Sequence, residues 1–455
     1  MTACADLIAA ALGPEPYRAS PQDLLPSQLE AVTEALGEYR GAIPVLDQRA
    51  SVAGVSRIAS LDDLIALLFS HATYKSYPAA LVRNRNWSRM NQWVSSLSRY
   101  PVGKEWGRDA QDVDEWLAEL DAAGHHIIST SGTTGKCSFL PASPRDGETF
   151  RRMTAAAREW SVGHAIGKRP AFLVGPRCGR GRFVEGYRAI AAAFGRAEKS
   201  FYLSERPVSV AEINRLGELR QAMASGHARP AEIRSAEERA RARQAETRKE
   251  FEALAARLTE YREEPIVVNG GGAGLYELVS VSRELGIPDA GFHPATVVIA
   301  GGGKKGTNLP PDCREQIRAF FGVERLISSY GMSEWNASWP QCAAGRYHCP
   351  PTTITLVLDL GNQESLAPEE DGVVVGRLAF LDLLVDARWG GLVTGDRVTG
   401  HLTPCPCGRG ASFTISDVER MVTSDDDKLT CAGTVEGYLR GALAASAADS
   451  SVPPP

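Results

Sequence analysis

One segment of the sequence, STSGTTGK, combines small residues, hydroxyl side chains and a single cation. Small residues leave backbone N–H groups accessible, and these groups together with hydroxyls and a lysine suit the oxygens of a polyphosphate. Thr130 stands where a Walker A loop needs its first glycine, and Cys137 follows the lysine instead of serine or threonine, so that motif is excluded. A flexible surface turn is the alternative. The loop consists of Ser129, Thr130, Ser131, Gly132, Thr133, Thr134, Gly135 and Lys136.

Cysteine and histidine residues gather in two short segments of the C-terminal half. The segment CPCG contains Cys405 and Cys407, and the earlier segment QCAAGRYHC contains Cys342, His348 and Cys349. Thiolates and an imidazole form the tetrahedral ligand sets that Zn2+ prefers in structural sites. We predict a structural zinc site, with Cys349 as a substitute ligand and free thiols as the alternative. Its four ligands are Cys342, His348, Cys405 and Cys407.

Two further glycine-rich segments follow apolar runs. The first, NGGGAGLYEL, starts at Asn269, and the second, GGGKKG, starts at Gly301. The dinucleotide-binding pattern G-x-G-x-x-G does not fit the first segment, because Leu275 or Glu277 occupies its last position. We therefore exclude NAD. Each glycine segment remains either a ligand contact or a tight turn between a strand and a helix.

Composition limits the classes of protein to consider. The chain has 455 residues, of which 43% are hydrophobic and 23% charged, as in globular proteins. A net charge of −5 gives no electrostatic reason to expect nucleic acid as a partner. No apolar run reaches the roughly 20 residues that span a bilayer, and no signal peptide is recognisable. Nine cysteines without a secretion signal indicate a reducing cytoplasm, where thiols bind metal or react.

The spacing of apolar residues predicts the elements that position these segments. RPAFLVGP, IVVNGGG, ATVVIAGGG and RLISSYGMSE predict strands, with helices between them, in an open α/β sheet whose ligands bind at the carboxyl ends of the strands. Residues 206–264 predict a helical excursion interrupted at Gly226 and Pro230. After about Thr352, alternating apolar runs predict a β-rich lobe.

The N-terminal part of the sequence predicts short helices and turns. Ser60 is a candidate N-cap for a helix over Leu61–His71. Aromatic and basic residues cluster from Tyr74 to Trp106. We expect an extended surface segment there that wraps the core, with a substrate entrance as the alternative.

The order of four motifs resembles the adenylate-forming (ANL) superfamily of acyl-CoA synthetases, luciferases and peptide-synthetase adenylation domains. The motifs are STSGTTGK, GGGKKG, YGMSE from Tyr330 and TGD from Thr394. The segments CPCGR and DDDKLTCAGTVEGYL resemble the phenylacetate-CoA ligase-like branch and the acyl-protein synthetases of bacterial bioluminescence. The resemblance spans about Gly124 to Leu443. It implies an α/β fold: a large N-terminal-type adenylation domain with parallel sheets flanked by helices and a β-rich sublobe.

The resemblance also implies a division of the chain. An N-terminal helical or irregular segment, 1–123, would pack on an adenylate-forming core at 124–400, and the helical excursion at 206–264 would belong to that core. A cysteine-containing lobe with a vestigial C-terminal end would cover 401–445, and 446–455 would be a disordered tail. Relatives carry a mobile C-terminal domain, whereas 59 residues follow Asp396 here, so we expect most or all of that domain to be missing.

Each motif residue receives a role from the resemblance. The STSGTTGK loop, including Lys136, would hold the β- and γ-phosphates of ATP, and Ser333 would lie near the α-phosphate. Glu334 would bind Mg2+, which prefers carboxylate oxygens, and Asp396 would accept hydrogen bonds from the ribose. The residues expected around the adenine are Gly301, Gly302, Gly303, Tyr330 and Gly331. The residues expected around the acyl substrate are Gly270, Gly271, Gly272 and Trp335.

The implied reaction is attack of a substrate carboxylate on the α-phosphate of ATP, which releases pyrophosphate and relies on positioning and charge neutralisation. The acyl group would then pass to a thiol or amine. The substrate would be a small aryl or fatty acid, and the acceptor CoA, a carrier protein, an amine or the thiol of Cys431. Lys428 or Lys304 would replace the lysine of the missing domain. A catalytically degenerate nucleotide-binding scaffold or partner subunit is the alternative, and the oligomeric state stays open.

Overall fold

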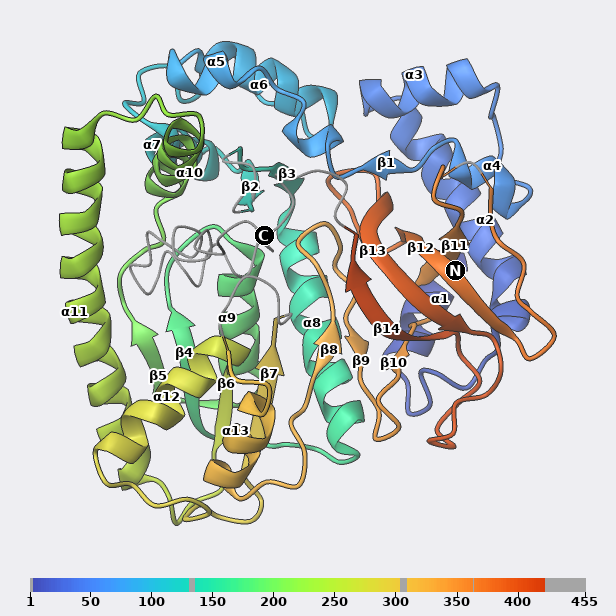
Figure 1. Ribbon diagram of the computed structural model, residues 1–455. Coiled ribbons are helices and arrows are strands. Elements are labelled where there is room, and N and C mark those ends of the chain that lie inside the picture. Colours follow the sequence, from blue (N-terminus) through green and yellow to red (C-terminus); the bar gives the residue numbers. More distant parts are fainter. Residues whose placement is uncertain (1–2, 131–135, 303–308, 363, 422–455) are drawn as a thin grey trace, which may run out of the picture. The chain divides into compact units, whose positions relative to one another are not determined.

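The computed structural model describes residues 3–130, 136–302, 309–362 and 364–421 (Figure 1). Within these residues the chain divides into two compact units. Unit 1 contains the residues up to Ser129, Ser138–His164 and the described residues from Ser329 onward. Unit 2 contains the described residues of Ala165–Ser328 together with Thr130, Lys136 and Cys137. The domain boundaries expected from the sequence stay a prediction.

Unit 2 is built on a parallel sheet in the order β5-β4-β6-β7. Its strands are β4 (Arg169–Pro176), β5 (Gly195–Ser204), β6 (Val267–Gly271) and β7 (Val297–Gly301). Its helices are α9 (Arg182–Phe194), α10 (Val210–Ala224), α11 (Pro230–Glu260), α12 (Gly272–Glu284) and α13 (Cys313–Phe321). The open parallel sheet expected from the repeat of strands and helices is therefore confirmed, and β4 has the bounds that its sequence predicts.

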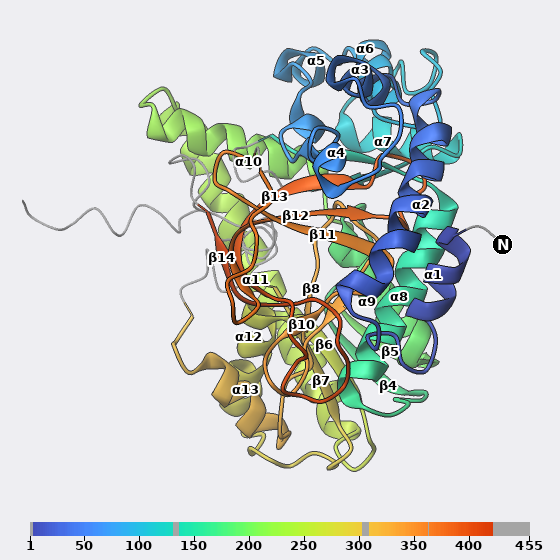
Figure 2. The same ribbon diagram turned by 90° about the vertical axis from the view of Figure 1, so that its right-hand side faces the viewer.

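Helices cover both faces of this sheet. Figures 1 and 2 show α9 on one face and α11 and α12 on the other. The second face holds a core of side chains from β4, β6 and β7 packed against α11, α12 and α13. Strands that are buried on both faces must be apolar throughout, and the fully buried run Ala171–Leu173 meets that requirement.

Unit 1 contains a sheet in the order β10-β14-β13-β12-β11, in which neighbouring strands are antiparallel. These strands are β10 (Tyr347–His348), β11 (Thr353–Leu358), β12 (Val373–Asp382), β13 (Gly391–His401) and β14 (Thr414–Arg420). Two short antiparallel pairs join β2 (His126–Ser129) to β3 (Phe139–Ala142) and β8 (Ser329–Tyr330) to β9 (Trp339–Pro340). The β-rich lobe predicted after Thr352 is confirmed.

Helices precede and flank this sheet in the sequence. They are α1 (Ala3–Ala11), α2 (Pro21–Arg40), α3 (Pro44–Ala53), α4 (Leu61–Ile65), η1 (Thr73–Lys75), α5 (Ala79–Arg83), α6 (Trp87–Ser96), α7 (Val113–Ala122) and α8 (Pro144–Val162). The core of unit 1 includes Trp335, Trp339 and Trp389 together with the apolar faces of β11 and β12. Across the described residues, we find no helix long and apolar enough to cross a membrane.

Three local predictions need correction. Ser60 does cap a helix, but α4 ends at Ile65, because the following Phe69–Ser70 forms β1 and pairs in parallel with β13. The segment from Tyr74 to Trp106 is not extended: it contains helices, and Tyr74 and Trp87 are buried in the core. RLISSYGMSE joins the parallel sheet only through an isolated bridge between Ile327 and Ile299 of β7, and its strand β8 has two residues and pairs with β9.

Candidate functional site

Tyr330 and Asp396 meet in unit 1. The Tyr330 hydroxyl donates a hydrogen bond to Asp396 Oδ2 over 2.7 Å, and Arg420 Nη1 lies 3.4 Å from Asp396 Oδ1. The Asp396 side chain retains 14% of its exposure, so its carboxylate is partly accessible. Burial first, and then the Asp396 carboxylate, raise the pKa of the Tyr330 phenol well above its usual value. Tyr330 therefore stays protonated and donates its hydrogen to Asp396.

The residues of the TGD motif have separate structural tasks. Thr394 Oγ1 accepts a hydrogen bond from the backbone N–H of Asp396 over 3.0 Å, which fixes the start of the aspartate side chain. A Cβ atom at Gly395 would come within 2.6 Å of the Arg420 guanidinium, so glycine leaves the space through which Arg420 reaches the carboxylate. The register of β13 and β14 pairs Asp396 with Arg420 directly. The motif thus delivers one oriented carboxylate beside a guanidinium.

Glu334 lies in the loop that connects β8 to β9. Its backbone carbonyl accepts a hydrogen bond from Arg388 Nη2 over 2.7 Å. Its partly exposed carboxylate makes no hydrogen bond or ion pair to other residues that the structure describes. The negative charge of Glu334 also contributes to the raised pKa of the Tyr330 phenol, after burial and the larger effect of Asp396. The charges of Asp396 and Glu334 thus both oppose ionisation of this tyrosine.

Aromatic side chains surround Tyr330. Its ring centroid lies 5.5 Å from that of Trp335, 5.9 Å from Trp339 and 6.1 Å from Tyr347. Trp335 is fully buried and packs against Phe380 at 4.4 Å. The structure thus gives Trp335 a core position, and its predicted role as a wall of an acyl pocket stays a prediction. Gly331 and Ser333 lie in the same β8–β9 loop, exposed and partly exposed respectively.

In unit 2, the two glycine segments lie at the carboxyl ends of the neighbouring strands β6 and β7. The register pairs Gly270 with Ala300 and Gly271 with Gly301, so both strands end side by side. This placement agrees with the rule that open α/β sheets bind ligands at the carboxyl ends of their strands. A Cβ at Gly270 would come within 2.9 Å of Val174 Cβ, whereas one at Gly272 would meet open space. Close packing therefore explains Gly270, and Gly272 leaves the N-terminus of α12 uncovered.

Several predicted residues lie at or beyond the limits of the described chain. Ser129 ends β2, and Thr130 follows it as a buried residue. Lys136 is partly buried, and Cys137 and Ser138 are buried just before β3. Gly302 adopts a positive φ of 81° after β7. The predicted residues outside the described ranges are Ser131, Gly132, Thr133, Thr134, Gly135, Gly303, Lys304, Lys428 and Cys431.

The cysteine and histidine residues predicted to bind metal come together in unit 1. The ligand atoms of Cys342, His348, Cys405 and Cys407 all lie within 4.8 Å of one another. Cys342 Sγ is 3.7 Å from Cys405 Sγ, and Cys407 Sγ is 3.5 Å from His348 Nε2. A tetrahedral zinc ion, with Zn–S near 2.3 Å and Zn–N near 2.0–2.1 Å, holds its ligands about 3.8 and 3.6 Å apart. These two separations match the corresponding edges of such a tetrahedron.

His348 has the orientation and charge state of a metal ligand. Its Nδ1 atom lies 3.2 Å from Ser412 Oγ, which leaves Nε2 directed at the cysteines. Burial, and after it the nearby Arg409 and Arg346, lower the pKa of His348 to about 4. The imidazole is therefore neutral near pH 7, the form that coordinates a metal. Trp160 covers the ring at a centroid distance of 4.7 Å.

The CPCG segment forms a tight turn that presents two sulfurs. The backbone N–H of Gly408 donates to Cys405 O over 3.0 Å, and Gly408 has a φ of +68°, which glycine adopts without strain. A Cβ at Gly410 would lie 2.1 Å from the carbonyl oxygen of Tyr17, so that position also requires glycine. Cys349 stands outside the group, with Sγ 3.1 Å from Thr355 Oγ1. Cys349 is thus not part of the group whose ligand atoms lie together, and zinc binding by the quartet stays a prediction.

From the sequence, no role was predicted for Arg420, for Arg388 or for the buried residues that hold the loop of Glu334. Arg420 follows Asp396 by 24 positions and has no motif of its own, and only the pairing of β13 with β14 brings it to the carboxylate. Arg388 is fully buried between Pro141 O and Glu334 O, at 2.8 and 2.7 Å. An arginine in an apolar stretch such as VDARWGG was the available signal, because a buried guanidinium needs specific partners.

Comparison with known proteins places this fold. No family model and no curated protein matches the sequence. Among solved structures, the chain is similar to a 2-hydroxyisobutyryl-CoA ligase in complex with 2-HIB-AMP and CoA, with 14% identity, a TM-score of 0.53, and coverage of 88% of this chain and 69% of that chain. ATP-bound MatB from Rhodopseudomonas palustris also matches at 14% identity, over 88% and 76% of the two chains, with a TM-score of 0.33 that supports no argument. The chain therefore shares the fold of this CoA ligase over the residues that the two structures have in common.

Proposed function

We propose that the protein activates a carboxylic acid with ATP. The observation that carries the proposal is the group formed by Tyr330, Asp396 and Arg420, with the Glu334 carboxylate nearby in the same unit. A partly exposed aspartate with two oriented donors suits the vicinal diol of a ribose, because the carboxylate oxygens can accept further hydrogen bonds. A carboxylate without a hydrogen-bond partner in the described chain suits Mg2+. Few other ligands require both groups together.

The reaction that these residues would support is acyl-adenylate formation. A carboxylate oxygen of the substrate forms a bond to the α-phosphorus of ATP, the bond from that phosphorus to the bridging oxygen breaks, and pyrophosphate leaves. Glu334 would hold Mg2+, whose charge offsets that of the phosphates. Asp396 and Arg420 would fix the ribose, and the Tyr330 ring would lie against the base. No side chain needs to act as a nucleophile, because positioning and electrostatics carry this chemistry.

We further propose Zn2+ for the quartet of Cys342, His348, Cys405 and Cys407. Three sulfurs and one imidazole nitrogen within 4.8 Å of one another would supply four protein ligands, which leaves no position for water on a tetrahedral ion. The ion would join β10 to the turn before β14, and β14 carries Arg420 at its other end. We therefore assign the metal a structural role rather than a catalytic one.

Exchange of labelled pyrophosphate into ATP tests the proposed function. The full chain is incubated with ATP, Mg2+ and each member of a panel of aryl and fatty acids, and exchange should depend on one class of acid. Glu334→Gln should abolish the exchange, whereas Glu419→Gln, an exposed change on β14, should leave it intact. Pyrophosphate exchange does not need an acyl acceptor, so CoA, carrier proteins and amines are assayed afterwards. ATP binding without exchange for any acid would instead favour a nucleotide-binding scaffold.

A further inference from the structure

A buried asparagine anchors the loop that carries Glu334. Asn336, two residues after Glu334, is completely buried. Its Nδ2 atom donates to Asp146 Oδ1 over 2.6 Å and to Leu384 O over 3.0 Å. Its backbone N–H donates to Asp382 Oδ2 over 2.6 Å. One residue thus ties the Glu334 loop to two buried carboxylates.

Both carboxylates are themselves held by backbone N–H groups. The additional donors to Asp146 are the N–H groups of Ser143, Asp386 and Ala387, at 2.8, 2.8 and 3.0 Å. The additional donors to Asp382 are the N–H groups of Ala337 and Leu384, each at 3.0 Å. All four carboxylate oxygens therefore have donors. Hydrogen bonds to buried, ionised acceptors are strong and directional, so neither carboxylate can rotate without losing several of them.

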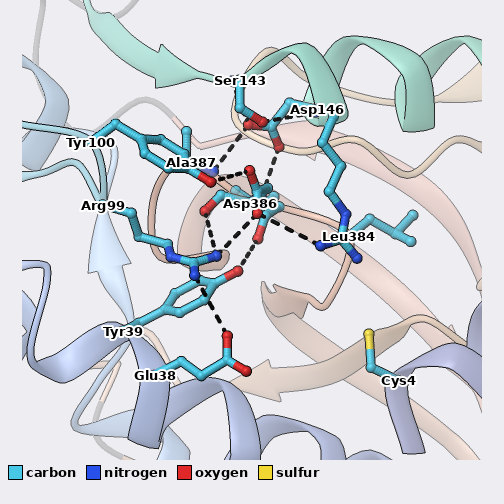
Figure 3. A network of polar contacts seen from close by, with 12 residues as sticks. Cys4, Glu38, Tyr39, Arg99, Tyr100, Ser143, Asp146, Leu384, Asp386 and Ala387 are labelled. Atoms are coloured by element: carbon cyan, nitrogen blue, oxygen red, sulfur yellow. Dashed lines mark hydrogen bonds and ion pairs between the residues drawn. The ribbon is translucent and has the colours of Figure 1, made fainter. Parts of the chain in front are cut away.

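The outer part of this network reaches α2 and α8. Figure 3 shows Asp146 and Asp386 beside each other, with Arg99 pointing at Asp386 and Tyr39 below it. Arg99 Nη1 lies 3.0 Å from Asp386 Oδ1, and Tyr39 donates to Val385 O over 2.9 Å. Asp146 lies in the first turn of α8, where the helix dipole favours negative charge. This network therefore connects the loop that carries Glu334 to α8, and through the segment around Asp386 to α2.

Arg388 adds a second anchor at Glu334 itself. Its guanidinium is fully buried and bridges the carbonyl oxygens of Glu334 and Pro141. Burial raises the pKa of Asp382, and the backbone hydrogen bonds to this carboxylate and, after them, the charge of Arg388 partly offset the shift. The Glu334 main chain is thus held at residue 334 by Arg388 and at residue 336 by the two aspartates.

We propose that Asn336 is a positioning residue for Mg2+ binding by Glu334, and this rests on the proposed function. The Glu334 carboxylate has no orienting hydrogen bond of its own within the described chain, so its direction depends on its main chain. A metal ligand must be held within a few tenths of an ångström of its productive place. Asn336, held by Asp146 and Asp382, supplies that restraint from the core.

Asn91 provides a matched control for this proposal. It is also completely buried in unit 1, and its Nδ2 atom donates to Gly103 O and Trp106 O over 2.9 and 2.8 Å. Its Oδ1 atom accepts from Trp116 Nε1 over 2.8 Å. Replacing Asn91 by alanine removes these three hydrogen bonds, and replacing Asn336 removes at least the two that its Nδ2 atom donates. Only Asn336 is linked to the Glu334 loop by the hydrogen bonds described above.

The test measures ATP binding by calorimetry across a series of Mg2+ concentrations, with thermal unfolding recorded for every variant. Asn336→Ala should raise the Mg2+ concentration for half-maximal ATP binding at least tenfold, as Glu334→Gln should. Arg388→Lys, which keeps the buried charge but cannot bridge both carbonyls, should raise it at least threefold. Asn91→Ala should lower the melting temperature but shift the Mg2+ midpoint less than twofold.

Each outcome decides the proposal. If Asn336→Ala and Arg388→Lys fold and keep the wild-type Mg2+ midpoint while Glu334→Gln shifts it, the positioning role is wrong and the proposed function stands. If Asn336→Ala does not fold, Asn336→Ser, a smaller change at the same position, replaces it and decides in the same way. If the wild-type protein binds ATP equally well without Mg2+, or Glu334→Gln has no effect, the metal role of Glu334 fails and the positioning role fails with it.

Discussion

The Tyr330 hydroxyl and the Asp396 carboxylate, 66 positions apart in the sequence, share a hydrogen bond of 2.7 Å. Arg420 approaches the other carboxylate oxygen from the neighbouring strand. Each carboxylate oxygen can accept two hydrogen bonds, so both partners can orient Asp396 while it accepts further bonds from a diol. We therefore expect a change of the Asp396 carboxylate to weaken ATP binding.

Asp396→Asn should raise the KM for ATP at least tenfold, about 1.4 kcal/mol of binding free energy. An amide has one acceptor oxygen, and its NH2 group would face either Tyr330 or Arg420, both of which are donors here. Steady-state pyrophosphate exchange at varied ATP measures the change. Asp417→Asn, at an exposed position of β14, is the control and should keep the wild-type KM. Equal KM values for Asp396→Asn and wild type would remove the ribose role.

Glu334→Gln should reduce acid-dependent exchange by two orders of magnitude or more at saturating ATP. Glutamine keeps the size and the backbone bond to Arg388 but removes the charge that Mg2+ requires. A series of Mg2+ concentrations should show a midpoint displaced to higher values rather than a lower plateau only. Unchanged Mg2+ dependence would contradict the assignment of this carboxylate.

What could be predicted from the sequence follows the range of the interactions involved. β4 and the parallel sheet were predictable because a strand buried on both faces has a continuous apolar run. The predicted metal residues lie together in the structure. They could be predicted because cysteine and histidine are chemically distinctive, so few combinations of residues had to be considered. The short strand β1 at Phe69 could not be predicted, because it pairs in parallel with β13, which is far away in the chain.

The buried network behind Glu334 left no local pattern in the sequence. Asp146 and Asn336 are separated by 190 positions and meet only through the fold. Asp146 alone reads as an ordinary N-terminal helix residue, and its capping bond with Ser143 explains it fully at that level. The prediction of an extended surface segment from Tyr74 to Trp106 was wrong for a similar reason. Tyr74 donates to Trp389 O, 315 positions away, so its burial depends on a distant partner.

Purified protein should contain about one equivalent of zinc, and Cys405→Ser should reduce it below half an equivalent. Removing one of four ligands leaves an open coordination position and weakens binding, and loss of the metal also removes the folding free energy that it supplies. We expect a lower melting temperature for Cys405→Ser, and for wild type treated with a chelator. Elemental analysis and thermal unfolding measure both effects.

Cys349→Ala is the control for the metal site. Cys349 neighbours His348 in the sequence but contacts Thr355 instead of the quartet. This variant should keep one equivalent of zinc, although its smaller core side chain will cost some stability. Loss of zinc from Cys349→Ala and retention in Cys405→Ser would show that the coordinating set is different.

Gly390→Ala should lower the free energy of unfolding by about 1–3 kcal/mol, the usual cost of forcing an extra group into a packed region. A Cβ at Gly390 would lie 2.1 Å from the backbone carbonyl oxygen of Asp382, so the main chain itself must move. Gly37→Ala is the matched change in the same unit: it lies within α2, and its Cβ meets nothing within 4 Å. That variant should gain up to about 1 kcal/mol because alanine favours helix. Urea denaturation distinguishes the two signs.

Tyr74 should make the free energy of unfolding fall as the pH rises above 10. Burial raises the pKa of this phenol from 10.0 to about 12, with a smaller opposing effect of Arg388. Between these values the unfolded chain releases a proton that the folded chain keeps, so alkali favours unfolding by up to about 1.4 kcal/mol per pH unit. Tyr74→Phe removes this proton and should make the decline between pH 10 and pH 12 shallower, although buried Tyr330 continues to contribute to it, and should cost about 1 kcal/mol at neutral pH for the lost bond to Trp389 O. Urea denaturation of both proteins at pH 8 and pH 11 makes the comparison, and parallel declines would show that Tyr74 does not carry the effect.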